Sequence, residues 1–338
     1  MPEKLTGKFL NIFKVLLAVL LVSALIYFGI VDVAVLQTIA HNPGILLILI
    51  LLCFVMHLIS IVRWQILLFC QGIEILNRQA AKSVFLALSL NSFLPGGGIS
   101  GDAVRMAYIT KKAPDRKAEA VLSVFMDRAL GFYGAITLGV FSGIFLFIQG
   151  VHDEVFVSLV IAAIIGFLGI PIMGLVLFIF IKRNESFRRF MWKEPVGKIR
   201  AVALRIVNSL DLYLQSPGKL FQAFVLSLII HTLVFGGMMV LGDSLGIEGM
   251  TAMGYSFATF CGVVGNLIPI TPGGLGVGEV AFDRVSHLLA NGAASGFGTV
   301  FFGYRVFSLV AILLGLVISF FPQGVLKVVA PTSSSEET

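Results

Sequence analysis

Long apolar runs separated by short polar stretches dominate this chain. The first run, at 9–30, follows Lys4 and Lys8. We expect it to be a retained transmembrane helix, because no small-residue cleavage site follows it as in a signal peptide. Five further runs have the length of membrane-spanning helices. They lie near 44–71, 116–149, 155–181, 218–243 and 293–322. The pattern predicts six transmembrane helices in an all-α, polytopic integral membrane protein.

Two other apolar stretches, 79–112 and 248–291, are interrupted near their centres by Pro and Gly. Each is expected to form an apolar helix, a break and a second short helix, either as two shorter helices or as a re-entrant hairpin. Lipid cannot satisfy the backbone groups that a break leaves free. At membrane depth, both breaks must therefore lie against protein or line a wet cavity.

Composition strengthens the membrane prediction. Hydrophobic residues make up 58% of the 338 residues and charged residues 12%, against roughly 45–50% and about 25% in soluble domains. These values exclude a soluble enzyme, a disordered protein and a secreted disulfide scaffold. Cys53, Cys70 and Cys261 lie in mostly apolar stretches without the spacing of metal ligands, so buried thiols are expected.

The placement of charge predicts the orientation. With both broken stretches as hairpins, the basic segments 105–117 and 182–219 fall on the same side of the membrane as both termini. The opposite loops, 31–43, 150–154 and 244–250, contain no Lys or Arg. The positive-inside rule then places both termini in the cytoplasm, and we expect a multi-pass protein of the inner or plasma membrane. This placement accounts for the net charge of +6 without a nucleic-acid partner.

The two halves of the chain resemble each other at a shift of 177 residues. The matched pairs are Pro95 with Pro272, Gly96 with Gly273, Gly97 with Gly274, Gly101 with Gly278, Asp102 with Glu279 and Arg128 with Arg305. The span before the first break runs inward and the span before the second runs outward. We therefore predict inverted repeats, 44–149 and 218–322, with a binding site where the broken helices meet near the midplane. Accidental resemblance of two Gly-rich kinks is the alternative.

The segment between the repeats, 182–217, is basic. Within it, residues 198–214 place apolar side chains at helical spacing with basic residues between them. This pattern fits an amphipathic helix on the cytoplasmic surface of the bilayer, or a connector helix packed on the bundle. The whole chain, 1–338, is predicted to be one membrane domain, and its polar tail, 331–338, to be disordered.

Two arginines lie deep in predicted spans. Arg128 and Arg305 stand about ten and twelve residues into their helices, or ~15 and ~18 Å from the start. An arginine at that depth costs about 2.5–3.5 kcal/mol on insertion scales, so each needs a partner or a wet cavity. Each is a candidate cationic site for an anionic lipid headgroup. The structural alternative pairs Arg128 with Asp102 or Asp127, and Arg305 with Glu279. Both interpretations hold if substrate displaces the acid.

The breaks supply further candidate substrate contacts. Glycine lets backbone approach a ligand closely, and helix starts attract phosphate. The candidates are Asn91, Pro95, Gly96 and Gly97 in the first break and Asn266, Thr271, Pro272, Gly273 and Gly274 in the second. Asp102 and Glu279 follow at the starts of the short helices. They either satisfy the helix dipole, or pair with the arginines and couple protons.

The remaining polar residues in apolar stretches indicate structural roles. His57 and His231 are expected to be hydrogen-bonded packing residues rather than metal ligands. Arg63 beside Trp64, and likewise Arg105, are expected to lie at the membrane interface. The sequence contains no recognisable nucleophile with its base, no paired soluble carboxylates and no metal-ligand cluster. We therefore expect a protein that is not an enzyme and holds no cofactor or metal.

The motifs resemble the lysylphosphatidylglycerol synthase transmembrane-region family, also known as the flippase-like domain family. The resemblance covers about 10–325 and is carried by NSFLPGGGISGDAVR at 91–105, Asp127-Arg128, and PITPGGLGVGE at 269–279. It implies two inverted repeats with re-entrant helices and a role in moving lipids between leaflets. The run Gly96-Gly97-Gly98 departs from the usual first motif, which often carries a basic residue.

The family also implies what to expect of chemistry. A similar module in the multiple peptide resistance factor is fused to a soluble aminoacyltransferase domain. These 338 residues have no such domain, so lysyl transfer is not expected. Other relatives are labelled as glycosyl-carrier-lipid synthases or linked to hopanoid lipids.

Together these observations predict a lipid transporter, or flippase, that moves an anionic phospholipid or a polyprenyl-phosphate-linked lipid between leaflets. Arg128 and Arg305 would anchor the headgroup. One alternative is a membrane-embedded transferase of the lysylphosphatidylglycerol synthase or glycosyl-carrier-lipid synthase type, with Asp102 or Glu279 as base. Another is a non-catalytic protein that presents lipid to a separate lipid-modifying synthase. The expected partners are membrane lipids, and in the last case that synthase.

Overall fold

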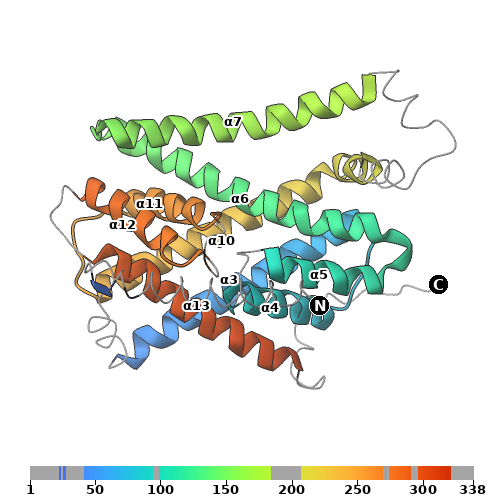
Figure 1. The fold of residues 1–338 in the computed structure, drawn as a ribbon, viewed down its shortest axis with the longest axis horizontal. Coiled ribbons are helices and arrows are strands. Elements are labelled where there is room, and N and C mark those ends of the chain that lie inside the picture. The colour runs from blue at the N-terminus through green and yellow to red at the C-terminus, as the bar shows by residue number, and fades with distance from the viewer. Residues whose placement is uncertain are drawn as a thin grey trace, which may run out of the picture.

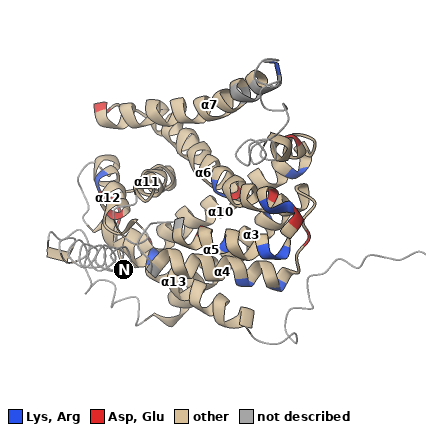
Figure 2. Cartoon of the chain, turned by 45° about the vertical axis from the view of Figure 1, so that its right-hand side comes forward, with Lys and Arg blue, Asp and Glu red and all other residues tan. Residues whose placement is uncertain are grey.

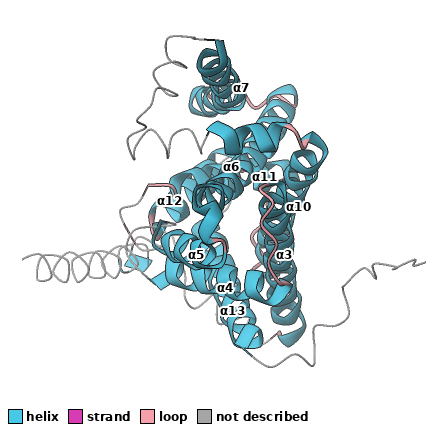
Figure 3. Ribbon diagram, turned by 90° about the vertical axis from the view of Figure 1, so that its right-hand side faces the viewer, coloured by secondary structure: helices cyan, strands magenta, loops and turns pink. Residues whose placement is uncertain are grey.

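The computed structural model describes residues 42–93, 99–183, 207–268, 271, 274–290 and 296–320, together with 23, 26 and 27. Within these residues the chain forms helices and turns and no strand (Figure 3). The all-α prediction is therefore confirmed for the part of the chain that the structure describes.

Five of the described helices are long and apolar enough to cross a membrane. They are α3 (Pro43–Cys70), α6 (Lys117–Ile148), α7 (Glu154–Arg183), α10 (Pro217–Ser244) and α13 (Phe297–Phe320). A 3-10 turn, Pro114–Arg116, precedes α6. These helices match five of the six predicted spans, while most of the first, 9–30, lies outside the described residues.

Local signals explain where several of these helices begin. Pro43 and Pro217 occupy the first positions of α3 and α10, where the missing N–H costs no hydrogen bond. The Asn42 side chain accepts a hydrogen bond from the Ile45 N–H at the start of α3 (3.4 Å). Such caps stabilise helix starts because the first N–H groups have no partner within the helix.

The two broken stretches each contain two helices, the second shorter than the first, as predicted, and residues 94–98 between the first two helices lie outside the described residues. The first forms α4 (Asn77–Phe93) and α5 (Ile99–Lys112), and the second forms α11 (Ala252–Gly265) and α12 (Val277–Leu289). The members of each pair contact one another. Glycine makes this close packing possible, because a Cβ on Gly101 would collide with the carbonyl of Ala87. A Cβ on Gly278 would lie 3.0 Å from the carbonyl oxygen of Gly262.

The start of α4 and the end of α5 lie at the same end of the bundle. Arg116, before α6, donates to the carbonyl of Gln71, after α3 (2.7 Å). The Gln71 side chain donates to the carbonyl of Ser209, shortly before α10 (2.9 Å). Arg78, at the start of α4, donates to the carbonyl of Phe320, at the end of α13 (3.0 Å). The first helix pair therefore enters and leaves the bundle at this end, on the right of Figure 1.

The start of α11 and the end of α12 lie at the opposite end of the bundle. A Cβ on Gly249, between α10 and α11, would lie 3.8 Å from Ala290 at the end of α12. A Cβ on Gly296, before α13, would lie 3.6 Å from Ile247, after α10. The two helix pairs thus enter the bundle from opposite ends (Figure 1).

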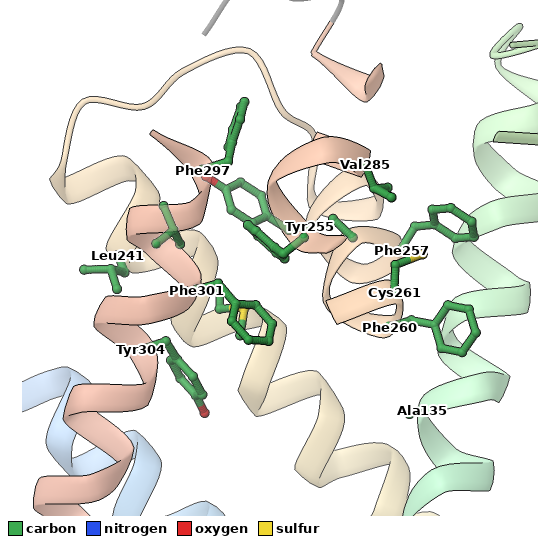
Figure 4. Packing of buried hydrophobic residues seen from close by; sticks show 14 of the residues in the cluster. Ala135, Leu241, Tyr255, Phe257, Phe260, Cys261, Val285, Phe297, Phe301 and Tyr304 are labelled. Carbon is green, nitrogen blue, oxygen red and sulfur yellow. The ribbon is translucent and has the colours of Figure 1, made fainter. Parts of the chain in front are cut away.

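The largest core cluster surrounds α11 and fixes the second helix pair. In Figure 4, Phe257 and Phe260 point from α11 toward α6, while Phe301 lies on the other side. Phe301 packs against Phe282 of α12 with ring centroids 5.3 Å apart. Gly262 faces Phe301 so closely that a Cβ there would overlap the ring. The packing of aromatic rings against glycine therefore determines how closely α11, α12 and α13 approach one another.

The outer surface is apolar, as a bilayer requires. The helix α7 lies at the edge of the bundle beside α6 (Figures 1 and 3). Its exposed side chains include Ile165, Ile172, Met173 and Val176. Exposed apolar residues along a helix of spanning length favour contact with lipid.

The described part of the segment between the repeats, 207–214, is helical. Tyr213 is buried there, and its hydroxyl donates to the carbonyl of Leu67 (3.3 Å). Burial raises the pKa of the Tyr213 hydroxyl above its usual range, because the charged form would lose solvation. The preceding residues, 184–206, and the tail, 331–338, lie outside the described residues.

Candidate functional site

The first acid–arginine pair joins the first helix pair to α6. Asp102 lies in the first turn of α5. Arg128 donates to it twice, from Nε to Oδ2 (2.6 Å) and from Nη2 to Oδ1 (2.9 Å). The Arg128 side chain is nevertheless 47% exposed, against 12% for Asp102. The structure therefore contains the predicted ion pair and leaves the other edge of the guanidinium open.

The second pair joins the second helix pair to α13 and is more enclosed. Arg305 Nη1 lies 3.2 Å from Glu279 Oε1, and the two side chains are 20% and 0% exposed. The other carboxylate oxygen of Glu279 accepts from the Gly276 N–H at the start of α12 (2.8 Å). Arg305 also donates from Nη2 to the side-chain oxygen of Asn266. Glu279 therefore accepts a hydrogen bond at the start of α12 through Oε2 and forms an ion pair with Arg305 through Oε1, which has no hydrogen-bond partner among the described residues.

An asparagine near the end of the first helix of each pair contacts the start of the second: Asn91 lies two residues before the end of α4, and Asn266 directly follows α11. The Asn91 side-chain oxygen accepts from the Gly101 N–H (2.6 Å). In the second pair, the Asn266 side-chain oxygen lies against Gly278, where a Cβ would overlap it. The asparagines are 175 residues apart and the glycines 177. The second break is thus two residues longer than the first, which the single shift of 177 does not anticipate.

The predicted break residues are only partly described. Thr271 is buried, and its hydroxyl donates to the Leu275 carbonyl (2.6 Å) within the turn. Gly274 has a φ of 72°, a backbone conformation that glycine adopts without strain, and it packs against Asn266. The remaining candidates in the breaks, Pro95, Gly96, Gly97, Pro272 and Gly273, lie outside the described residues.

A buried ion cluster stands beside the first pair. Asp127, next to Arg128 in sequence, accepts from Arg63 Nε (2.8 Å) and from Arg105 Nη1 (2.9 Å). Arg63 also donates to the Ser227 hydroxyl of α10 (2.9 Å). The cluster therefore links α3, α5, α6 and α10. Asp127 and Arg128 point to different sides of α6, since adjacent helical positions lie about 100° apart. Asp127 therefore pairs with Arg63 and Arg105 and not with Arg128.

The expectation that Arg63, Trp64 and Arg105 lie at the membrane interface is wrong. All three side chains are buried. The Arg105 guanidinium lies over the Trp64 ring, 3.9 Å from its centroid, and the indole N–H donates to the Ser123 hydroxyl (3.2 Å). The physical reason is Asp127, because a carboxylate this deep needs cationic partners. The sequence analysis considered Asp127 only as a partner of Arg128, and it missed that this acid in mid-span could draw Arg63 and Arg105 inward.

Both membrane histidines have packing roles. His57 Nε2 lies 3.2 Å from the Ser308 hydroxyl, and His231 Nε2 lies 2.8 Å from the carbonyl oxygen of Gly131. These contacts agree with the interpretation of hydrogen-bonded core residues. Among the described residues, no group of three or more His, Cys, Asp or Glu side chains is placed to hold a metal ion.

The five long apolar helices among the described residues indicate a helical integral membrane protein. The family model described as Lysylphosphatidylglycerol synthase TM region matches residues 11–315. The chain therefore belongs to the lysylphosphatidylglycerol synthase transmembrane-region family, which confirms the resemblance carried by its motifs. A comparison with curated proteins found no match. Family and fold together fit a lipid-related role in a membrane.

Proposed function

We propose that this protein is a lipid transporter, or flippase, that moves an anionic phospholipid or a polyprenyl-phosphate-linked lipid between leaflets. One observation carries the proposal. Two helix pairs enter from opposite ends, and each places an acid, Asp102 or Glu279, against an arginine of a long apolar helix. Broken helices related in this way are typical of transporters built from inverted repeats around a central site.

In this proposal α4–α5 and α11–α12 are re-entrant hairpins, and the end of the bundle that holds Gln71 and Arg116 faces the cytoplasm. Figure 2 supports this orientation, since Lys and Arg gather toward that end. The turns 150–153 and 245–251, at the other end, contain no Lys or Arg. Both termini then lie in the cytoplasm of a cell with the protein in its inner or plasma membrane.

The chemistry of transport here is an exchange of anions at arginine. A guanidinium binds carboxylate and phosphate with the same two-pronged geometry. A headgroup phosphate can therefore replace the carboxylate at one of these arginines while the acyl chains stay in lipid. No bond of the lipid is made or broken. Asn91, Asn266 and the Pro-Gly breaks would move with the short helices as the two sides open in turn.

The test is lipid movement in vesicles of purified protein and phosphatidylcholine that contain a little fluorescent phosphatidylglycerol. Dithionite destroys the dye in the outer leaflet, so movement appears as loss of the protected inner half. We expect loss in vesicles with wild-type protein, slower loss with Arg128→Gln, and normal loss with Arg284→Gln, a control at an exposed position on α12.

Protected fluorescence that stays constant with wild-type protein, for phosphatidylglycerol and for a polyprenyl-phosphate probe alike, would contradict transport. Retention of lipid by the protein without movement would favour presentation to a separate synthase instead.

A further inference from the structure

The two acid–arginine pairs differ in the charge that surrounds them. The first half has two neighbouring ion-paired groups, Arg63–Asp127–Arg105 and Arg128–Asp102, and their three arginines and two aspartates have a formal charge of +1 together. The Arg305–Glu279 pair in the second half is neutral.

The residues that make the difference have aromatic counterparts. The positions 177 residues beyond Arg105 and Asp127 are Phe282 and Tyr304. Both aromatic side chains are buried. The second half therefore replaces an ion pair with aromatic packing at the same register, while the acid and the deep arginine stay. The extra positive charge is a property of the first half.

Two of the three arginines have hydrogen-bond donors to spare. The Nε and Nη2 atoms of Arg105 are buried and have no hydrogen-bond partner among the described residues, and the side chain is only 4% exposed. Arg128 uses Nε and Nη2 for Asp102, and its Nη1 bonds no other described residue. A buried positive charge without a counter-charge is costly, and the cost falls when an anion arrives.

We infer that the first pair alone is the anion site, and that it takes a singly charged phosphodiester of a lipid headgroup. The inference rests on the proposed function and narrows its substrate. A phosphodiester carries one negative charge, which balances the +1 of the group. A phosphomonoester or a pyrophosphate would leave negative charge in excess. Arg128 would bind the phosphate with its open edge, while Arg105 and Arg63 would keep the electrostatic potential of the neighbouring cluster positive. Arg305 and Glu279 would hold α12 against α13 and bind no phosphate.

The test is a binding titration of the full chain in detergent, followed by native mass spectrometry. The probes are phosphatidylglycerol, phosphatidic acid, phosphatidylcholine and inorganic phosphate. We expect phosphatidylglycerol to bind more tightly than phosphatidic acid. We also expect no effect of inorganic phosphate at matched concentration, since the acyl chains hold the headgroup at this depth.

Three variants locate the site. Arg128→Gln should weaken phosphatidylglycerol binding by about tenfold or more, because it removes charged hydrogen bonds. Arg305→Gln, its counterpart in the second half, should change the affinity by less than about threefold, because no charged hydrogen bond to the lipid is lost. Asp102→Asn should tighten binding, since it removes a negative charge beside the bound phosphate. A gain of affinity cannot come from a misfolded protein.

Equal losses in Arg128→Gln and Arg305→Gln, weaker binding in Asp102→Asn, or a preference for phosphatidic acid would each overturn the inference. Displacement of phosphatidylglycerol by inorganic phosphate would assign the site to a free anion and overturn its lipid source. The proposed function fails separately, because binding at Arg128 in detergent without movement in vesicles would contradict transport and leave this inference standing.

Discussion

The first and second helix pairs share a frame and differ in what lies behind it. In both, an asparagine lies near the end of the first helix, a glycine permits close packing, and an acid at the next position pairs with a deep arginine. Behind the first pair lies the Arg63–Asp127–Arg105 cluster, and behind the second lie aromatic rings. The comparison teaches that the shared residues join the two helices of each pair, while the residues that differ determine the local charge and the exposure of the arginine.

Removing the acid of the buried cluster should have the largest effect on this comparison. In Asp127→Ala, two buried arginines lose their counter-charge, so the free energy of unfolding should fall by about 3–5 kcal/mol. The matched change in the second half, Tyr304→Phe, removes weak contacts of the hydroxyl with Met56 Sδ (3.5 Å) and with the Cys53 thiol and should cost less than about 1.5 kcal/mol. Equilibrium unfolding in mixed detergent micelles measures both. Similar costs would mean that the cluster is not the main difference between the halves.

Adding a methyl group at the shared glycines should have the next largest effect. Gly101→Ala and Gly278→Ala each insert a Cβ where backbone or side-chain atoms already lie. Overpacking of this kind costs about 1–3 kcal/mol. Gly174→Ala, in α7, meets nothing within 4 Å and serves as the control, with no loss expected. The same unfolding measurement applies, and a harmless Gly101→Ala would show that α4 and α5 are not closely packed in solution.

Neutralising the two acids should separate the open pair from the closed one. Glu279 is fully buried, accepts a hydrogen bond from the Gly276 N–H and forms an ion pair with Arg305, so Glu279→Gln should cost about 1–3 kcal/mol. Asp102→Asn should cost less than about 1 kcal/mol, because Arg128 is half exposed and solvent screens the pair. Thermal unfolding of both variants in one detergent gives their order. A larger loss for Asp102→Asn would reverse the assignment of open and closed halves.

Much of the fold follows from the sequence for simple reasons. Run length and hydropathy predict a spanning helix without reference to neighbours, and the described spans match on that basis. The breaks follow from clusters of Pro and Gly, whereas the isolated Pro171 lies inside α7 without ending it. The two-residue difference between the breaks did not follow, because a repeat read from matched residues at one shift cannot reveal an insertion between them.

The site was predictable only where partners lie at matching positions of a repeat. Asp102 with Arg128 and Glu279 with Arg305 recur at one spacing, which points to a shared role. The partners of Asp127 do not recur, since Arg63 is 64 residues away on α3 and Arg105 is 22 residues away on α5. An arginine near the end of a span has the same sequence signature whether it reaches toward water or toward a buried acid. Only packing distinguishes the two.

The central claim is that the first pair, and not the second, binds an anionic lipid. The most direct test is mass spectrometry of the lipids that remain bound after gentle purification of wild type, Arg128→Gln and Arg305→Gln. The account predicts enrichment of one singly charged phosphodiester lipid in wild type and Arg305→Gln, and its loss in Arg128→Gln. The bulk lipid composition in all three folded proteins, or equal loss in both variants, would contradict it.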